Sequence, residues 1–261
     1  MLALTLATTI HIGVLGTHHP VEVDVRPASP TALTVETRGK TQVIQGTESI
    51  HLDGPARITG PKGSFVRMAI CLPNGVTREY YGRLEVRRHY YELQLIVEMD
   101  RELAVASILA AEGAAALPPE ALRAQAIVVR SYMLAATDRH AGFDMCDTTH
   151  CQQFGPPPAP NSVAMKAALA TRGQVLTYRG NIVPAMYSAN CGGRTRTLAE
   201  AGWQPGEYPF FAVDCPLKGA VSGHRIGMCQ TGAAELARRG FSFQEIVDRY
   251  FPATAIEAVE K

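Results

Sequence analysis

Between residues 10 and 100, hydrophobic and polar positions alternate in short runs that are rich in β-branched side chains. Glycine, proline and asparagine residues separate these runs. Alternation of this kind directs every second side chain to one face of a strand, so it predicts a β-rich segment. The predicted strands are IHIGVL, VEVDVRP, ALTVETRG, TQVIQG, FVRMAICL and RLEVRRHYYELQLIVEM, the last of which contains two paired strands around a polar turn.

From Glu102 onwards the pattern becomes helical. An alanine- and leucine-rich run predicts one helix at 101–117, and a second is predicted from Pro119 to about Asp138. Proline is tolerated at the start of a helix because the first N–H groups have no partner within the helix. The second helix is apolar nearly all round, which is typical of a helix at the centre of a domain. Arg130 lies within it and needs a partner, because an unpaired buried charge costs several kcal/mol.

The C-terminal part combines further helices with a hairpin. A helix capped by Asn161 or Ser162 follows a proline-rich loop, and a hairpin turns at residues 179–181. The helix GAAELARRG ends in glycine, and SFQE has the residues of a capping box for a last helix. The sequence therefore predicts an α+β fold. Its β-rich N-terminal portion, 1–100, would be packed on a mixed helix/sheet catalytic core, 101–261, with a central buried helix.

The composition is that of an ordinary globular protein, with 46% hydrophobic and 19% charged residues. A formal net charge of +1 gives no field that favours nucleic acid or a membrane surface, so no nucleic-acid partner is expected. No stretch approaches the roughly 18 apolar residues of a membrane span. The opening MLALTLATTI is apolar but lacks a basic n-region and a clear cleavage site, so it is either the end of a trimmed export signal or the first strand.

The segment RHAGFDMCDTTHCQQFG brings His140, Cys146, His150 and Cys151 close together in the sequence. Two thiolates and two imidazoles are a ligand set that tetrahedral zinc takes in structural sites, although this spacing is not that of a zinc finger. Unrelated buried side chains and thiol catalysis with a histidine base are the other interpretations. A Cys146–Cys151 disulfide would close only a short loop, with little entropic gain. Zinc bound by all four residues would have no open position, so the chemistry would lie elsewhere.

Four motifs in the same order make the chain resemble the stage II sporulation protein D (SpoIID/LytB) family over about residues 100–251. These motifs are PPEALRAQAIVVRSYML, CDTTHCQQF, QVLTYRGNIVPAMYSANCGGRT and GHRIGMCQTGA. Family members act on bacterial cell-wall peptidoglycan; the sporulation protein is a lytic transglycosylase of glycan strands stripped of stem peptides, and relatives are called amidase enhancers. The resemblance implies an extracytoplasmic lytic transglycosylase, with peptidoglycan glycan strands as its substrate and a cell-wall amidase as a further partner.

The resemblance also implies the site residues. The family's catalytic glutamate falls on Glu112, and its functionally important arginine falls on Arg130. Its zinc site falls on the four residues of the Cys/His cluster, which implies a structural Zn²⁺ as cofactor. The implied substrate-binding positions in the last two motifs are Tyr187, Ser188, Gly192, Gly193, His224 and Gln230. The chain departs from the family pattern at Arg225 and Thr231, where glycine and an aromatic residue are usual, and this departure bears on substrate fit.

Glu112 is also singled out by its alanine-rich, apolar surroundings. Desolvation there is expected to raise its pKa and to keep a fraction protonated near neutral pH, as a general acid requires. One carboxyl group is enough for a lytic transglycosylase, because the C6 hydroxyl of the muramyl sugar attacks its own C1. The rival functions are a non-catalytic glycan-binding enhancer of an amidase and a zinc or thiol hydrolase centred on the Cys/His cluster.

Three cysteines, Cys191, Cys215 and Cys229, flank the glycine-rich loops. A bridge among them would brace these loops in an exported protein, and a reduced state is the alternative. Trp203, the one tryptophan, is interpreted as a packing residue or as a stacking surface for a sugar ring.

Overall fold

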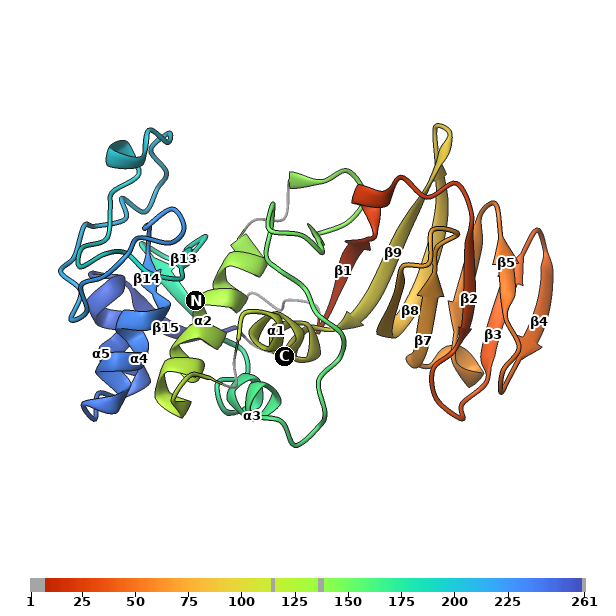
Figure 1. The fold of residues 1–261 in the computed structure, drawn as a ribbon, viewed down its shortest axis with the longest axis horizontal. Helices are drawn as coiled ribbons and strands as arrows, with labels where there is room; N and C mark the ends of the chain where they lie inside the picture. Colours follow the sequence, from red (N-terminus) through yellow and green to blue (C-terminus); the bar gives the residue numbers. More distant parts are fainter. Residues whose placement is uncertain (1–7, 114–115, 136–138, 260–261) are drawn as a thin grey trace. The chain divides into compact units, whose positions relative to one another are not determined.

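The computed structural model describes residues 8–113, 116–135 and 139–259, and it has the mixed α and β fold that the sequence predicts. The ends of both helices predicted after Glu102 lie partly outside the described residues. The chain divides into two compact units (Figure 1). Among the described residues, 8–107 and 139–157 form the strand-rich unit, and 108–113, 116–135 and 158–259 form the helix-rich unit. No helix in the described part of the chain combines the length and hydrophobicity needed to cross a bilayer.

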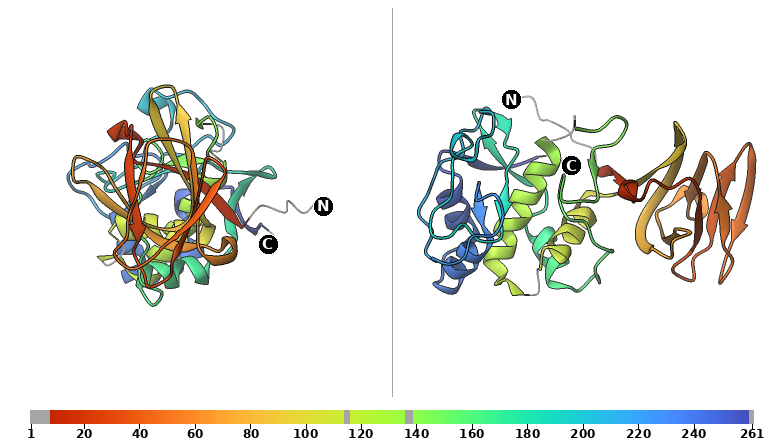
Figure 2. Two further views of the ribbon diagram at one scale, coloured as in Figure 1. Left: turned by 90° about the vertical axis from the view of Figure 1, so that its right-hand side faces the viewer. Right: turned by 45° about the horizontal axis from the view of Figure 1, so that its top comes forward.

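The strand-rich unit contains a ten-stranded sheet in its described residues. Its strands are β1 (Thr9–Val14), β2 (Val23–Pro27), β3 (Leu33–Thr37), β4 (Lys40–Ile44), β5 (Ile50–Leu52), β6 (Ala56–Thr59), β7 (Val66–Cys71), β8 (Thr77–His89), β9 (Glu92–Asp100) and β10 (Met145–Cys146). The main path is β10-β1-β9-β8-β6-β3-β4, and β7, β2 and β5 continue from β8 in that order. In the left view of Figure 2 these strands curve around one another. Short 3₁₀ turns lie at Gly16–His18 and Pro61–Gly63.

The long strand β8 joins the two parts of this sheet. Residues 77–82 of β8 pair with β7. In its second half, residues 84–86 pair with β6, and residues 83–89 pair with β9. The β8–β9 hairpin turns at Tyr90 and Tyr91, so the predicted pair of strands is confirmed. The sequence pattern missed β5 and β6, because three and four residues are too few to display an alternation. Inward-facing side chains such as Val35, Ile58 and Leu84 are fully buried and form the core of the unit.

The segment that holds the Cys/His cluster belongs to the strand-rich unit. Its strand β10 pairs in parallel with β1, with Ile12 opposite Met145 and Gly13 opposite Cys146. The buried Asp147 carboxylate accepts hydrogen bonds from Leu15 N–H at 3.0 Å and from the Arg78 guanidinium at 2.7 Å. The structure thus groups residues 139–157 with the β-rich portion, whereas the sequence placed this segment in the C-terminal core.

The helix-rich unit is organised around one helix. Its helices are α2 (Pro119–Ala135), α3 (Val163–Ala170), α4 (Gln230–Arg238) and α5 (Phe243–Tyr250), with a 3₁₀ turn at Ala199–Ala201. Its strands are β11 (Gln174–Tyr178), β12 (Asn181–Ile182), β13 (Tyr187–Ser188), β14 (Met228–Cys229) and β15 (Ala255–Ala258). α2 packs against α3, α4, α5 and β11. Most of its side chains are buried, as its apolar sequence predicts.

The local signals at helix ends and turns are also confirmed. Ser162 caps α3 by accepting the Met165 N–H, and Ser242 with Glu245 forms the capping box of α5. The β11–β12 hairpin turns at Arg179 and Gly180, both with positive φ. The remaining helix, α1 (Arg101–Ala111), contains the boundary between the two units, and its last turn belongs to the helix-rich unit.

Candidate functional site

Glu112 lies directly after the last turn of α1 and is half-buried. Its N–H donates to the Ile108 carbonyl at 2.9 Å. The next residue, Gly113, has φ of 87°, a left-handed conformation that commonly ends a helix. The carboxyl group is therefore held at the C-terminal end of a helix, where the helix dipole opposes a negative charge.

Tyr187 connects Glu112 to the first glycine-rich loop. Its hydroxyl makes a side-chain hydrogen bond with the Glu112 carboxyl group. Burial raises the pKa of Tyr187 well above its usual value, and the charge of Glu112 and this hydrogen bond raise it further. The phenol consequently stays protonated and acts as the donor to the carboxyl group.

His224 contacts the backbone of Tyr187. Its ring hydrogen-bonds the Tyr187 backbone, and its Nδ1 accepts the Ile226 N–H at 3.0 Å. Burial lowers the pKa of His224, and the bond to the Tyr187 backbone opposes this effect. Trp203 lies beside it, with ring centroids 5.4 Å apart, and is 45% exposed. The Trp203 side chain is thus partly accessible to solvent next to His224.

The parallel pair β13–β14 places Tyr187 opposite Met228 and Ser188 opposite Cys229. Gln230 follows at the start of α4. Within the described residues, the buried Ser188 Oγ and Gln230 Nε2 have no hydrogen-bond partner. Unpaired buried polar atoms cost free energy, so a water molecule or a ligand that reached them would gain hydrogen bonds.

Gly192 and Gly193 have a structural reason to be glycine. Their φ angles are 75° and 111°, and the Gly192 N–H donates to Asn190 Oδ1 at 2.9 Å. A Cβ on Gly192 would lie 2.8 Å from the Val221 side chain. The pair therefore shapes the loop that follows Tyr187 and Ser188.

Arg130 is completely buried in α2. Its guanidinium donates to the carbonyls of Gln174 at 3.0 Å, Ala168 at 3.1 Å and Ala126 at 3.4 Å. These bonds tie α2 to the end of α3 and the start of β11. They supply the partners that a buried arginine needs, while a catalytic role for Arg130 stays a prediction.

The Cys/His cluster is assembled in the strand-rich unit. The ligand atoms of all four residues lie within 4.8 Å of one another. His140 Nε2 is 3.1 Å from Cys151 Sγ, and His150 Nδ1 is 3.7 Å from each of the two sulfurs. A tetrahedral zinc with ordinary Zn–S and Zn–N bonds separates a sulfur and a nitrogen by about 3.6 Å. The donor types and their spacing therefore fit zinc.

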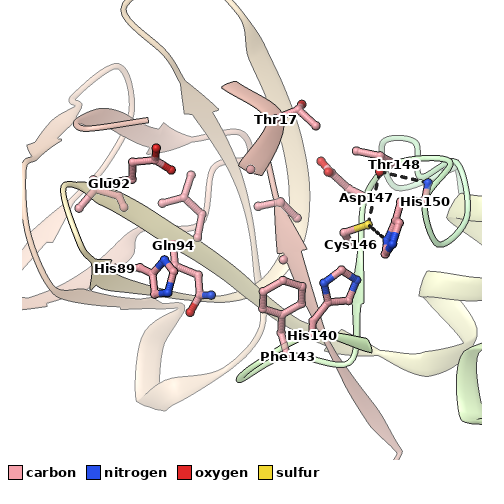
Figure 3. A pocket seen from close by; sticks show the side chains of 15 residues that line it. Thr17, His89, Glu92, Gln94, His140, Phe143, Cys146, Asp147, Thr148 and His150 are labelled. Carbon is pink, nitrogen blue, oxygen red and sulfur yellow. Dashed lines mark hydrogen bonds between the residues drawn. The ribbon is translucent and has the colours of Figure 1, made fainter. Parts of the chain in front are cut away.

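His140, Cys146 and His150 line a cavity of about 350 Å³, and their side chains lie close together there (Figure 3). The hydrogen bond between the two thiols lowers the pKa of Cys146, and the same bond, together with burial, raises the pKa of Cys151, so one of the two thiols is favoured as a thiolate. A thiolate is the form that binds metal. Asp147, the residue after Cys146, anchors this loop to β1 and β8 through Leu15, Arg78 and Tyr80.

Residues 89–178, which contain Glu112, Arg130 and the whole Cys/His cluster, match the family model described as stage II sporulation protein, SpoIID. This segment belongs to the SpoIID family. The chain is 38% identical over 81 residues to the amidase enhancer of Bacillus subtilis. This aligned region covers 31% of the present chain and 11% of that protein. The chain is also 31% identical over 151 residues to an uncharacterised protein of Brachyspira hyodysenteriae. That aligned region covers 57% of the present chain and 38% of the relative.

The SpoIID segment ends before Tyr187, His224 and Gln230, so the comparison with the family model does not reach these residues. The structure brings Tyr187 and His224 into one hydrogen-bonded group with Glu112. Sequence reasoning missed the anchoring role of Asp147. The available signal was an acidic residue directly after a candidate metal ligand. Its partners lie just after β1 and in β8, which are distant in the chain, so the sequence alone did not reveal them.

Proposed function

We propose that this protein is a lytic transglycosylase of peptidoglycan, with Glu112 as its single general acid and base. The observation that carries the proposal is the hydrogen-bonded group of Glu112, Tyr187 and His224, next to the partly exposed Trp203. The SpoIID family and a relative named amidase enhancer support a role in the cell wall. Such a role would be exercised outside the cytoplasm.

In the proposed reaction Glu112 first gives its proton to the glycosidic oxygen while the bond from that oxygen to C1 of the muramyl sugar breaks. The C6 hydroxyl oxygen of the same sugar then bonds to C1, and its proton passes to the Glu112 carboxylate. The products are a free hydroxyl on the leaving sugar and a 1,6-anhydro muramyl end. Glu112 is protonated again, so the cycle needs neither water nor a second carboxyl group.

The surroundings of Glu112 suit both halves of this cycle. The end of α1 opposes the negative charge, which favours the proton-donating form. The Tyr187 hydroxyl bond stabilises the carboxylate that forms after proton transfer and fixes its orientation. Ser188 and Gln230 would supply hydrogen bonds to sugar hydroxyl or acetamido groups, and Trp203 would stack on a sugar ring.

The cluster of His140, Cys146, His150 and Cys151 would hold a structural zinc ion. Four protein ligands leave no open coordination position, so the metal would clamp its segment and take no part in the reaction. Removing zinc should therefore lower the melting temperature, with activity following the folded fraction. A hydrolase centred on this cluster would instead lose turnover while it stays folded.

The test is incubation with purified glycan strands that lack stem peptides, followed by mass spectrometry for anhydro-muramyl ends. Glu112→Gln should abolish these ends while the melting temperature and glycan binding persist. The matched control is Glu257→Gln, an exposed glutamate on β15 of the same unit, which should keep wild-type activity. Anhydro ends that form equally fast with Glu112→Gln would refute the role of Glu112.

A second candidate function is a non-catalytic glycan-binding protein that enhances a cell-wall amidase. The observation in its favour is the name of the Bacillus subtilis relative, amidase enhancer. This function predicts that the chain stimulates an added amidase on intact cell walls without producing anhydro ends. It also predicts that Glu112→Gln stimulates as well as wild type does.

A further inference from the structure

Three cysteines meet in the core of the helix-rich unit. The sulfurs of Cys191, Cys215 and Cys229 lie within 4.8 Å of one another, and all three residues are buried. They come from three separate segments: the glycine-rich loop after β13, the loop before Leu217, and strand β14. This three-cysteine cluster is distinct from the Cys/His cluster, whose residues all belong to the strand-rich unit.

Backbone N–H groups point at each of these sulfurs. Cys229 Sγ accepts from Cys191 N–H at 3.3 Å and from Gly232 N–H at 3.4 Å. The Gly193 backbone hydrogen-bonds Cys191, and the Leu217 backbone hydrogen-bonds Cys215. Fixed N–H donors directed at sulfur stabilise a thiolate and are a common outer shell of metal-bound cysteine.

Hydroxyl groups complete these surroundings. Thr231 Oγ1 lies 3.3 Å from Cys229 Sγ, and the Tyr250 hydroxyl lies 3.3 Å from Cys215 Sγ. Three thiolates in one buried space repel each other strongly unless a cation lies between them. A disulfide could join only two of the three sulfurs and would leave the third without a partner.

The spacing also suits a metal of the zinc class. Zn–S bonds of about 2.3 Å in tetrahedral geometry place the sulfurs about 3.8 Å apart. Sulfurs already within 4.8 Å of one another need to shift by only about 1 Å to reach this arrangement. Thiolate ligands are the soft donors that select zinc over magnesium or calcium.

We propose that Cys191, Cys215 and Cys229 bind a second zinc ion through three thiolates. A water molecule or one of the two neighbouring hydroxyl groups takes the fourth position. This ion links the loop after β13 to β14 and to the start of α4. Ser188 is the last residue of β13, and Gln230 is the first residue of α4. The inference rests on the contacts of the three cysteines and does not depend on the proposed reaction.

The first experiment measures zinc per chain by mass spectrometry in the full-length protein, purified without chelator. Wild type should contain two zinc ions, and Cys215→Ser and Cys146→Ser should each contain one. Cys71 belongs to neither cluster, so Cys71→Ser is the matched control and should keep both ions. A zinc content of Cys215→Ser equal to that of wild type overturns the inference.

Two measurements keep the test decisive if Cys215→Ser does not fold. Thiols are counted in wild type with a disulfide-exchange reagent after denaturation in chelator, where six reactive thiols are expected from the six cysteines. Four thiols would reveal a disulfide, and a peptide map that places it on Cys191, Cys215 or Cys229 would overturn the inference. In the Cys146→Ser/Cys151→Ser double variant, added Co²⁺ should give the charge-transfer absorption of cobalt bound to thiolate. Lack of that absorption in the folded double variant overturns it as well.

Discussion

The hydrogen bond between Tyr187 and Glu112 gives a direct test of the proposed mechanism. Tyr187→Phe removes the hydroxyl and leaves the ring that packs in the helix-rich core. A hydrogen bond to a charged group contributes roughly 1.5–3 kcal/mol, and the lower end applies here because both side chains are half-buried. At about 1.4 kcal/mol per factor of ten, the rate should fall roughly ten- to thirtyfold.

The assay is the initial rate of anhydro-muramyl end formation on stripped glycan strands, measured from pH 4.5 to 8.5. In wild type the Tyr187 hydroxyl stabilises the carboxylate. Its loss should move the limb of the pH–rate profile that reports the Glu112 proton towards higher pH. Tyr178→Phe is the matched control, because Tyr178 is a half-buried tyrosine of the same unit whose ring contacts Tyr208 rather than the site.

Two results separate a positioning role from a purely structural one. If Tyr187→Phe keeps its melting temperature but loses rate and shifts its profile, the hydroxyl acts on Glu112. If the variant has the wild-type rate and an unshifted profile, the hydrogen bond does not serve catalysis and the reasoning is wrong. A fall in rate that only parallels a fall in the folded fraction would equally contradict it.

Three further outcomes are expected. Arg130→Lys should lower the free energy of unfolding by ~1–3 kcal/mol in urea titrations, because an ammonium group cannot donate to all three carbonyls as the guanidinium does. Lost activity at unchanged stability would instead support a catalytic role for Arg130. The folded-state pKa of His224 lies below its ordinary 6.5, so the unfolded chain binds the extra proton below that pH. The contribution of His224 to the free energy of unfolding is therefore complete above about pH 6.5, and it declines as the pH falls towards the folded-state pKa. His224→Gln should flatten this decline, which is measured as the urea midpoint between pH 5 and 7. Trp203→Ala should weaken glycan binding about fivefold, as the loss of ~1 kcal/mol of stacking implies, without lowering the melting temperature.

Local signals in the sequence were enough to predict the elements whose hydrogen bonds are local. The Ser242 capping box, the Ser162 cap and the Arg179–Gly180 turn all depend on partners within a few residues. Strands β5 and β6 were missed because they are held by pairing with β2, β3 and β8 rather than by a pattern of their own. Pairing with strands that are distant in the chain leaves no alternating pattern in a strand this short.

The candidate site shows the same division. Sequence motifs indicated Glu112, Tyr187 and His224 as separate residues, but their hydrogen bonds join positions from α1, β13 and the loop before β14. Arg130 was predicted to need a partner. These partners include backbone carbonyls near the end of α3 and at the start of β11. Every residue carries a carbonyl, so no residue type in the sequence could identify them.

The proposed zinc ion would act together with the protein contacts that hold residues 139–157 on the strand-rich unit. β10 adds two register pairs with β1, and the Asp147 carboxylate accepts three hydrogen bonds. The Met145 and Phe154 side chains of the segment are also buried. Zinc coordination would add four bonds between residues 140 and 151 to these contacts. Chelation should therefore expose the amides of this segment to hydrogen exchange before those of β8 and β9, and unchanged protection after verified zinc removal would contradict the argument.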